Sequence, residues 1–452
     1  MKVVIIGAGE AGLYAAYELS KLTDYEITVL EKGNDIYSRK CPIIEGKVNK
    51  CINCATCAIM NGFGGAGAFS DGKFNFTTEF GGWLTDYLTK EETMSLIEYV
   101  DSINIKFGAT TERFTTSSKE AEEVKIKALQ NDLHLLNADC KHLGTENNLK
   151  ILSNIYEYLK DKVNFKFNTS VQTFNEHEVI TDKETLPYDY LICAPGRSGA
   201  EWLANIFKGL GVHLTNNQVD IGVRVELPAL VFKHITDTVY ESKLVYRTKQ
   251  YGDFVRTFCM NPYGQVVTEN TEGIITVNGH SYSDPKLQSE NTNFALLVSN
   301  KFTEPFNAPY KYGKHIASLS NMLAGGVLVQ RFGDLIKGNR TTSHRLQQSR
   351  VRPTLTAATP GDLSLAIPKR QLDDIIEMIY ALDKIAPGTA NYDTLLYGAE
   401  VKFYSSRVDL DENLETPIKN VFAIGDGAGI TRGLSQAGAS GVKVARVICN
   451  RK

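Results

Sequence analysis

The 452-residue chain lacks the features that mark several protein classes. Lys and Arg number 49 and Asp and Glu number 52, so no basic excess favours nucleic-acid binding and no acidic excess indicates a polyanionic tail. No apolar run approaches the roughly 20 residues of a membrane span, and the N-terminal segment does not resemble a signal peptide. We therefore expect a cytoplasmic protein whose partners include neither nucleic acid nor a membrane.

Internal repeats and low-complexity segments are also missing. Hydrophobic residues make up 42% of the chain and charged residues 22%, which excludes a mainly disordered, collagen-like or coiled-coil protein. Strand and helix patterns alternate instead. Residues 2–7 predict a buried strand, residues 10–22 a helix and residues 26–30 a second strand.

A glycine-rich turn joins the first predicted strand to its helix. Gly7, Gly9 and Gly12 have the Gly-x-Gly-x-x-Gly spacing, and Glu31 follows the second strand. In this arrangement the first glycine makes a tight turn, the second lets the backbone approach a diphosphate, and the third allows close helix–strand packing. The helix N-terminus faces the phosphates, and the carboxylate accepts hydrogen bonds from ribose hydroxyls. The segment therefore predicts a dinucleotide site.

A second strand–turn–helix motif near the C-terminus indicates which dinucleotide is bound. Residues 420–433 resemble the second FAD fingerprint of two-dinucleotide-binding flavoproteins, and a helix is predicted over 434–450. The resemblance implies that Asp426 binds the ribityl chain and that Gly433, Leu434 and Ser435 offer donors to the pyrimidine edge of the flavin, where a helix dipole stabilises negative charge. Residues 188–196 resemble a segment that passes the cofactor in such proteins. Ala194 and Gly196 match it, whereas Pro195 replaces a Thr.

A longer set of motifs extends the resemblance over nearly the whole chain. These are residues 61–73, 261–264, 277–282, 398–405 and 425–429. Together they resemble a family of bacterial FAD-dependent dehydrogenases without an assigned substrate. Part of that family carries a Glu at the position of Asp426. In the loop over residues 61–73, Gly64 and Gly65 leave room for a flat ring, and Ser70, Asp71 and Lys73 are candidate hydrogen-bond partners of the cofactor.

The resemblance and the strand pattern together predict an α/β fold. We expect a Rossmann-like FAD-binding domain that is discontinuous in sequence, with an inserted α+β substrate domain. The predicted FAD-binding parts are residues 1–84, which include the Cys- and Gly-rich loop, 161–215 and 391–452. Residues 85–160 are predicted as a helical segment and residues 216–390 as the substrate or cap domain.

Four cysteines lie close together before the glycine loop. They are Cys41, Cys51, Cys54 and Cys57, and the last three have C-x-x-C-x-x-C spacing. Four thiolates would suit a [4Fe–4S] cluster, although the Pro-linked cysteine of ferredoxins usually comes last. They would also suit zinc or a dithiol that exchanges electrons with the flavin. The fourth alternative is a set of ordinary thiols without such a role.

Substrate chemistry requires a proton donor or acceptor beside the flavin. His280 in the Asn278-Gly279-His280 segment is our first candidate, followed by Arg432 and His344. The leading hypothesis is an FAD-dependent oxidoreductase that transfers hydride through flavin N5 to or from a small or medium organic substrate. Its electron partner would be nicotinamide or a ferredoxin-like protein.

Two other functions remain as alternatives. The first is an FAD-dependent enzyme that modifies RNA, because some such proteins share both fingerprints; the near-neutral charge argues against it. The second is a non-redox protein in which the dinucleotide is structural or a cysteine donates sulfur.

Overall fold

The computed structural model describes residues 1–48, 52, 54–271, 273–282, 284–303, 305–306 and 308–451. The chain forms two compact units, each assembled from segments that lie far apart in the sequence. Unit 1 consists of Met1–Arg113, Lys141–Asn217 and Tyr404–Lys452, and unit 2 of Phe114–Cys140 and Gln218–Phe403. No helix among the described residues has the length and apolar character needed to cross a membrane.

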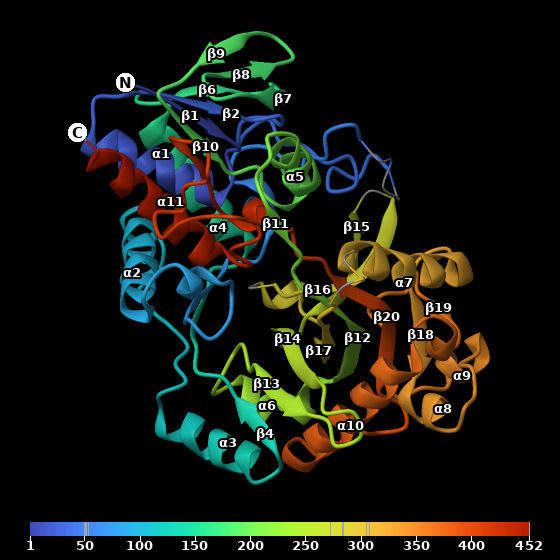
Figure 1. Cartoon of the computed structure of the whole chain (residues 1–452). Coiled ribbons are helices and arrows are strands. Elements are labelled where there is room, and N and C mark those ends of the chain that lie inside the picture. Colours follow the sequence, from blue (N-terminus) through green and yellow to red (C-terminus); the bar gives the residue numbers. More distant parts are fainter. Residues whose placement is uncertain are drawn as a thin grey trace. The chain divides into compact units, whose positions relative to one another are not determined.

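Unit 1 contains a five-stranded parallel sheet in the order β22-β10-β1-β2-β6. The central strand is buried over four consecutive residues, as expected for a parallel sheet that is covered on both faces. The five strands are β1 (Lys2–Ile6), β2 (Glu26–Leu30), β6 (Asn164–Lys166), β10 (Tyr190–Cys193) and β22 (Val421–Ala423). This is the Rossmann-like sheet that the sequence predicts, and Figure 1 shows it at one end of the picture.

Five helices accompany this sheet in unit 1. They are α1 (Glu10–Leu22), α2 (Lys90–Lys106), α4 (Thr145–Leu159), α5 (Ala200–Gly209) and α11 (Leu434–Cys449). The first and last helices of the chain lie side by side (Figure 1). Their backbones touch at Gly441, where a Cβ would lie 2.1 Å from the carbonyl oxygen of Ala11. The C-terminal helix is therefore part of the core around the first dinucleotide motif.

Shorter elements complete unit 1. The strands β7, β8 and β9 form a small antiparallel sheet, and β11 pairs with β21. The bounds are η1 (Gly65–Phe69), β3 (Lys73–Phe76), η2 (Leu84–Asp86), β7 (Val171–Phe174), β8 (Glu178–Thr181), β9 (Thr185–Pro187), η3 (Arg197–Gly199), β11 (Leu214–Thr215), β21 (Arg407–Val408) and η6 (Asp426–Ala428). The strand β5 (Asp139–His142) spans the boundary between the two units.

Unit 2 contains an eight-stranded, mainly antiparallel sheet in the order β19-β18-β20-β12-β17-β14-β13-β4. Its strands are β4 (Leu133–Leu135), β12 (Val219–Pro228), β13 (Leu244–Arg247), β14 (Phe254–Asn261), β17 (Asn291–Asn300), β18 (Leu328–Arg331), β19 (Thr359–Pro360) and β20 (Leu395–Lys402). The hairpin of β15 (Gln265–Thr271) and β16 (Ile274–His280) forms a separate two-stranded sheet.

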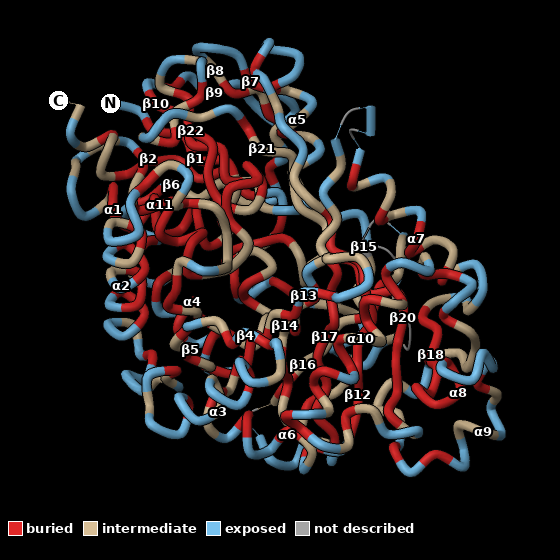
Figure 2. The backbone as a smooth tube through the Cα atoms, turned by 60° about the horizontal axis from the view of Figure 1, so that its bottom comes forward, coloured by how far each residue is buried: buried red, intermediate tan, exposed pale blue. Residues whose placement is uncertain are grey.

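The helices of unit 2 lie in the segments between these strands. They are α3 (Lys119–Leu129), α6 (Ala229–Thr236), α7 (Pro309–Ala324), α8 (Phe332–Ile336), α9 (Ser343–Gln347) and α10 (Lys369–Ile385), with the short turns η4 (Pro285–Leu287) and η5 (Leu363–Leu365). Val223 and Val225 of β12 pack in one apolar core with Phe232 of α6 and Ile375 of α10. Figure 2 shows that the central strands are buried along most of their length.

Apolar residues occupy every second position of the central strand β12 from Val219 to Leu227. Its apolar residues face the helices, so the alternation places Asp220, Arg224 and Glu226 on the opposite face of the sheet. All three are buried as well. Unit 2 therefore has its largest apolar core on one face of β12 and buried polar residues on the other face, with two smaller apolar clusters that include Val277 and Ile316.

The boundaries differ in part from those expected from sequence. Residues 85–160 do not form one helical segment, because β4 and β5 interrupt the helices and residues 114–140 belong to unit 2. Strands of three and four residues are too short to show the period-two pattern that predicts a strand. Unit 2 also extends to Phe403, beyond the expected boundary at residue 390, because β20 is a central strand of its sheet.

Candidate functional site

The first glycine motif forms the turn between β1 and α1 in unit 1. Gly7 has a φ of +100°, and a Cβ on it would lie 2.2 Å from the carbonyl oxygen of Ala194. A Cβ on Gly12 would lie 2.0 Å from the carbonyl oxygen of Gly7. A Cβ on Gly9, by contrast, would lie 3.8 Å from its nearest neighbour, the Cα atom of Gly65. The fold therefore requires Gly7 and Gly12, whereas protein packing alone does not require Gly9.

Glu31 follows β2 and its carboxylate is buried beside this turn. One carboxylate oxygen accepts a hydrogen bond from the N–H of Ala8 at 2.9 Å. The other accepts from the N–H groups of Gly33 at 2.8 Å and Gly62 at 2.9 Å. The carboxylate thus shapes the turn and the glycine loop, in addition to its predicted role toward a ribose.

The glycine loop lies against the first motif. Gly9 and Gly64 form an isolated parallel bridge, in which the N–H of Gly64 donates to the carbonyl oxygen of Ala8 at 2.8 Å. Gly64 and Gly65 both have positive φ values, +82° and +57°, which favour glycine. The structure therefore brings the loop of residues 61–67 to the dinucleotide turn.

Two other predicted residues of this loop make contacts within the protein. The hydroxyl of Ser70 donates to the carbonyl oxygen of Gly67 at 2.7 Å. The ammonium group of Lys73 lies 3.3 Å from the carboxylate of Asp71. Their predicted contacts with a cofactor remain predictions.

Arg39 organises the same loop, although none of the sequence motifs includes it. Its buried guanidinium donates to the carbonyl oxygens of Ala58, Phe63 and Ile59 at 2.9, 2.5 and 2.8 Å. Burial lowers the pKa of Arg39 to about 10, against the effect of nearby Glu31. A single arginine outside the glycine and cysteine motifs gives no sequence signal for such a role.

The second motif begins where β22 ends, beside the segment that follows β10. A Cβ on Gly427 would lie 2.8 Å from the carbonyl oxygen of Gly196, so the two turns are in close contact. The carboxylate of Asp426 accepts a hydrogen bond from the Thr431 hydroxyl at 2.7 Å and lies 3.7 Å from Arg197. The two resemblance-based segments therefore meet in unit 1.

Helices α1 and α11 both begin at a glycine that provides no side-chain cap, Gly9 and Gly433. Their first N–H groups can therefore serve a ligand. At the start of α11, after Leu434, the hydroxyl of Ser435 and the amide oxygen of Gln436 are buried without a hydrogen-bond partner among the described residues. Buried polar atoms normally have partners. Together with the open approach to Gly9, these unpaired atoms fit FAD as the group that unit 1 binds.

The predicted metal ligands lie only partly within the described residues. Cys51 is outside them. Cys41 and Cys57 are half-buried and Cys54 is exposed, each as a free thiol. The described part of the chain contains no group of three or more metal-ligating side chains. A metal at this cluster is therefore without structural support and stays a prediction.

The three predicted catalytic residues occupy different environments. His280 ends β16 in unit 2, with its ring 4.8 Å from that of Tyr282. His344 is exposed on α9 and lies 3.4 Å from Gln348. Arg432 is in unit 1, where its guanidinium lies 4.7 Å from the ring of Tyr404. These contacts leave the catalytic roles as predictions.

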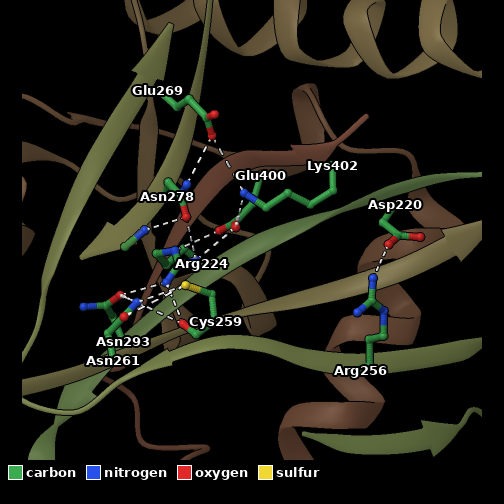
Figure 3. Close-up of polar contacts among 11 residues, drawn as sticks. Asp220, Arg224, Arg256, Cys259, Asn261, Glu269, Asn278, Asn293, Glu400 and Lys402 are labelled. Carbon is green, nitrogen blue, oxygen red and sulfur yellow. Dashed lines mark hydrogen bonds and ion pairs between the residues drawn. The ribbon is translucent and has the colours of Figure 1, made fainter. Parts of the chain in front are cut away.

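Unit 2 contains a buried charged cluster around Arg224, which the sequence analysis did not identify (Figure 3). Arg224 is 0% exposed, and its guanidinium forms a bidentate ion pair with the Glu400 carboxylate, at 2.8 and 3.0 Å. It also donates to the side-chain oxygens of Asn293 at 2.8 Å and Asn278 at 3.3 Å. Burial disfavours the charge on Arg224, but Glu400 outweighs this effect and the pKa of Arg224 is raised.

The Asn278-Gly279-His280 segment gains a structural explanation from this cluster. A Cβ on Gly279 would lie 2.2 Å from both an Arg224 nitrogen and the Asn293 oxygen. The missing side chain thus lets β16 cross the buried guanidinium. The Asn278-Gly279-His280 motif, which contains the catalytic candidate His280, is therefore part of the packing around Arg224.

A half-exposed ring next to the cluster is surrounded by cations. The ammonium group of Lys243 lies 4.7 Å from the centre of the Phe258 ring, and Arg256 and Lys402 lie 5.1 and 5.9 Å from it. Arg256 is ion-paired with Asp220. Burial lowers the pKa of Lys243 to about 7, assisted by Arg256 and opposed by Glu241. Lys243 can therefore gain and lose a proton near neutral pH.

The fold and these contacts define a flavoprotein of the Rossmann type with a second, sheet-based unit. Residues 218–403 match the family described as "FAD-dependent protein, C-terminal domain-like", and residues 5–41 match an NAD(P)-binding Rossmann-like domain. The first match covers unit 2 apart from its N-terminal segment. The chain is thus similar to an FAD-dependent family over most of unit 2 and to a Rossmann-like domain at its N-terminus, in agreement with its motifs.

One relative of known sequence is similar over almost the whole chain. It is an uncharacterised protein of Clostridium beijerinckii, 27% identical over 478 residues, which covers 99% of this chain and 80% of the relative.

Solved structures are similar at lower identity. They include CtdE in complex with FAD (11% identity, TM-score 0.36, 100% of this chain and 84% of that one) and tetracycline destructase Tet(51) (11%, 0.38, 100% and 82%). A tetrameric form of 2-methyl-3-hydroxypyridine-5-carboxylic acid oxygenase has 12% identity, a TM-score of 0.37, and coverage of 99% and 81%.

Proposed function

We propose that the chain is an FAD-dependent oxidoreductase that acts on a small or medium-sized organic substrate. The observation that carries the proposal is the convergence of both fingerprints in unit 1. The turn at Gly9 contacts the loop at Gly64, and the turn at Gly196 contacts the turn at Gly427. The close approach of Gly7 to Ala194 links the two pairs. Such a convergence supports a bound dinucleotide, and the family match supports FAD as its identity.

Bound FAD would supply hydride transfer at its N5 atom. The residues that would hold it are Gly7, Gly9, Gly12, Glu31, Gly64, Gly65, Ala194, Gly196, Asp426, Gly433, Leu434 and Ser435. The first turn of α1 would donate N–H groups to the diphosphate, and the first turn of α11 would donate to the ring. Ser70 and Lys73 remain second candidates, because each already contacts a neighbour in the loop.

Unit 2 is proposed to recognise the substrate. Its half-exposed Phe258 ring offers an apolar surface, and Lys243 has a pKa suited to proton transfer at neutral pH. Lys243 joins His280 as a candidate proton carrier. Arg224 and Glu400 would position this layer, because both are fully buried.

The proposal is tested on anaerobically purified protein. We expect a flavin absorption spectrum, release of FAD on denaturation, and bleaching of the spectrum by a two-electron reductant. Screening NADH, NADPH and a reduced ferredoxin then identifies the electron donor. A protein that carries no FAD and binds none when it is added contradicts the proposal.

Iron and zinc analysis of the same sample addresses the cysteine cluster. About four irons with a broad additional absorbance would support a [4Fe–4S] cluster that passes single electrons to the flavin. A clean flavin spectrum without metal would restrict the cysteines to thiol chemistry or to no role.

A further inference from the structure

Glu10 is an acidic residue in the turn that is expected to bind the diphosphate of the cofactor. It stands between Gly9 and Gly12 in the first fingerprint and is the first residue of α1. The N-terminus of this helix is where the phosphates of a dinucleotide bind. An ionised carboxylate at this point would repel the ligand that the rest of the motif favours.

The surroundings of Glu10 do not stabilise an ionised carboxylate. The residue is 7% exposed, and neither carboxyl oxygen has a hydrogen-bond partner among the described residues. A Cβ on Gly67 of η1 would lie 3.1 Å from one of these oxygens and 2.9 Å from a methyl carbon of Leu434. The carboxyl group therefore lies in a narrow slot beside the glycine loop, and Leu434 of α11 borders the same slot.

Among the described residues, no cation on the elements packed against this slot offsets the burial of Glu10. η1 has no ionisable side chain, and the first on α11 is Lys443, which pairs with Glu92 at 2.7 Å. On α1 itself, Tyr14 faces Glu10 and donates its hydroxyl to an Asn104 oxygen at 2.5 Å. The Asp101 carboxylate of α2 is paired with Lys141 at 2.6 Å. Burial without compensation raises the pKa of Glu10 to about 8.

We propose that Glu10 binds FAD as a neutral carboxylic acid. Its O–H donates a hydrogen bond to an oxygen of the diphosphate-containing chain that joins the flavin and adenine rings of the cofactor. This inference rests on the proposed function, in which unit 1 holds FAD. The neutral acid adds a donor to the N–H groups of the first turn of α1, and the cofactor supplies the partner that the buried carboxyl lacks. Ionisation removes the donor and places a negative charge against the diphosphate.

The test is the pH dependence of FAD affinity for the purified full-length protein, followed by flavin fluorescence. We expect the wild-type Kd to be constant below a pH of about 8 and to rise about tenfold for each further pH unit. Glu10→Gln keeps a donor of similar size that does not ionise, so its Kd should stay flat. Asp24→Asn, which removes an exposed charge after α1, should follow the wild type.

An identical pH dependence in Glu10→Gln and wild type overturns the inference, as does a flat wild-type curve. Either result leaves FAD binding itself intact, whereas absence of FAD binding at every pH overturns the proposed function as well. If Glu10→Gln does not fold, infrared difference spectra of FAD binding to the wild-type protein replace it. A perturbed protonated-carboxyl band at neutral pH supports the inference, and its absence contradicts it.

Discussion

The carboxylate of Glu31 accepts a hydrogen bond from the backbone N–H of Gly62 at 2.9 Å, across 31 positions of sequence. This bond ties the end of β2 to the glycine loop, while Ala8 and Gly33 donate to the same carboxylate. Glu31→Gln leaves one acceptor oxygen for three donors. We expect it to lower the free energy of unfolding by about 1–3 kcal/mol and to weaken FAD retention at least tenfold.

Thermal unfolding and FAD titration check this prediction. Glu26→Gln is the matched control, because Glu26 is exposed at the other end of the same strand. Full FAD retention and an unchanged melting temperature in Glu31→Gln would show that the three backbone contacts do not need the carboxylate.

Substitution of Gly12 should prevent folding, whereas substitution of Gly9 should weaken FAD binding. Gly12→Ala puts a Cβ 2.0 Å from the carbonyl oxygen of Gly7, so we expect loss of folded protein. The new methyl group of Gly9→Ala would lie 3.8 Å from its nearest neighbour, the Cα atom of Gly65, so the apoprotein should keep its melting temperature. We expect its FAD affinity to fall at least tenfold, because the new methyl group stands where the diphosphate approaches. Wild-type affinity in Gly9→Ala would contradict this placement of the cofactor.

The buried pair of Arg224 and Glu400 should behave as a unit. Arg224→Met removes the bidentate partner of the fully buried Glu400 carboxylate and leaves it only the ion pair with Lys402 at 3.0 Å, and we expect the change to destabilise the protein by about 3–5 kcal/mol. The double variant Arg224→Met/Glu400→Met should recover part of this loss, since it removes the buried carboxylate as well and leaves Lys402 paired with Glu269 at 4.0 Å. Chemical unfolding of the wild type, both single variants and the double variant gives the free energies of unfolding for this double-mutant cycle. Arg340→Met, at an exposed position, is the control. Additive losses in the double variant would show that the ion pair is not coupled.

Lys243 should give stability a characteristic pH dependence. Burial lowers its pKa to about 7 from the ordinary 10.5, so between these pH values the unfolded chain binds more protons than the folded one. The penalty of burying this lysine is therefore full below pH 7 and fades toward pH 10.5. Relative to wild type, Lys243→Met should be most stable at or below neutral pH, and this advantage should shrink as the pH rises. Melting temperatures measured across this pH range test the trend; a pH-independent difference would exclude a low pKa.

Thiol labelling separates the cysteines by environment. Cys54 is exposed, whereas Cys193 is fully buried, and burial raises the pKa of its thiol. We expect an alkylating reagent to modify Cys54 in the native protein and Cys193 only after unfolding. If the cluster binds iron or zinc, anaerobic protein should protect Cys54 until a chelator removes the metal. Equal labelling before and after chelation, in protein that retains its flavin, would argue against a metal there.

Much of the fold follows from local sequence signals. The strands predicted over residues 2–7 and 26–30, the helix over 10–22 and the helix over 434–450 are all present. Each is a long or strongly patterned segment with clear ends. The positions of Gly7 and Gly12 were also predictable, because a tight turn and a close helix–strand contact demand glycine wherever they occur.

The contacts around Arg224 in unit 2 and around Arg39 in unit 1 depend on tertiary structure. Arg224, Glu400 and Asn278 are distant in sequence, and only the pairing of β12 with β20 and the crossing of β16 bring them together. Arg39 reaches three loop carbonyls that no local pattern predicts. The sequence by itself determined the cofactor class, since a phosphate-binding turn is a local structure. Burial and partners decide whether Glu10 and Lys243 carry charge at neutral pH, and both arise only when segments far apart in the chain pack together.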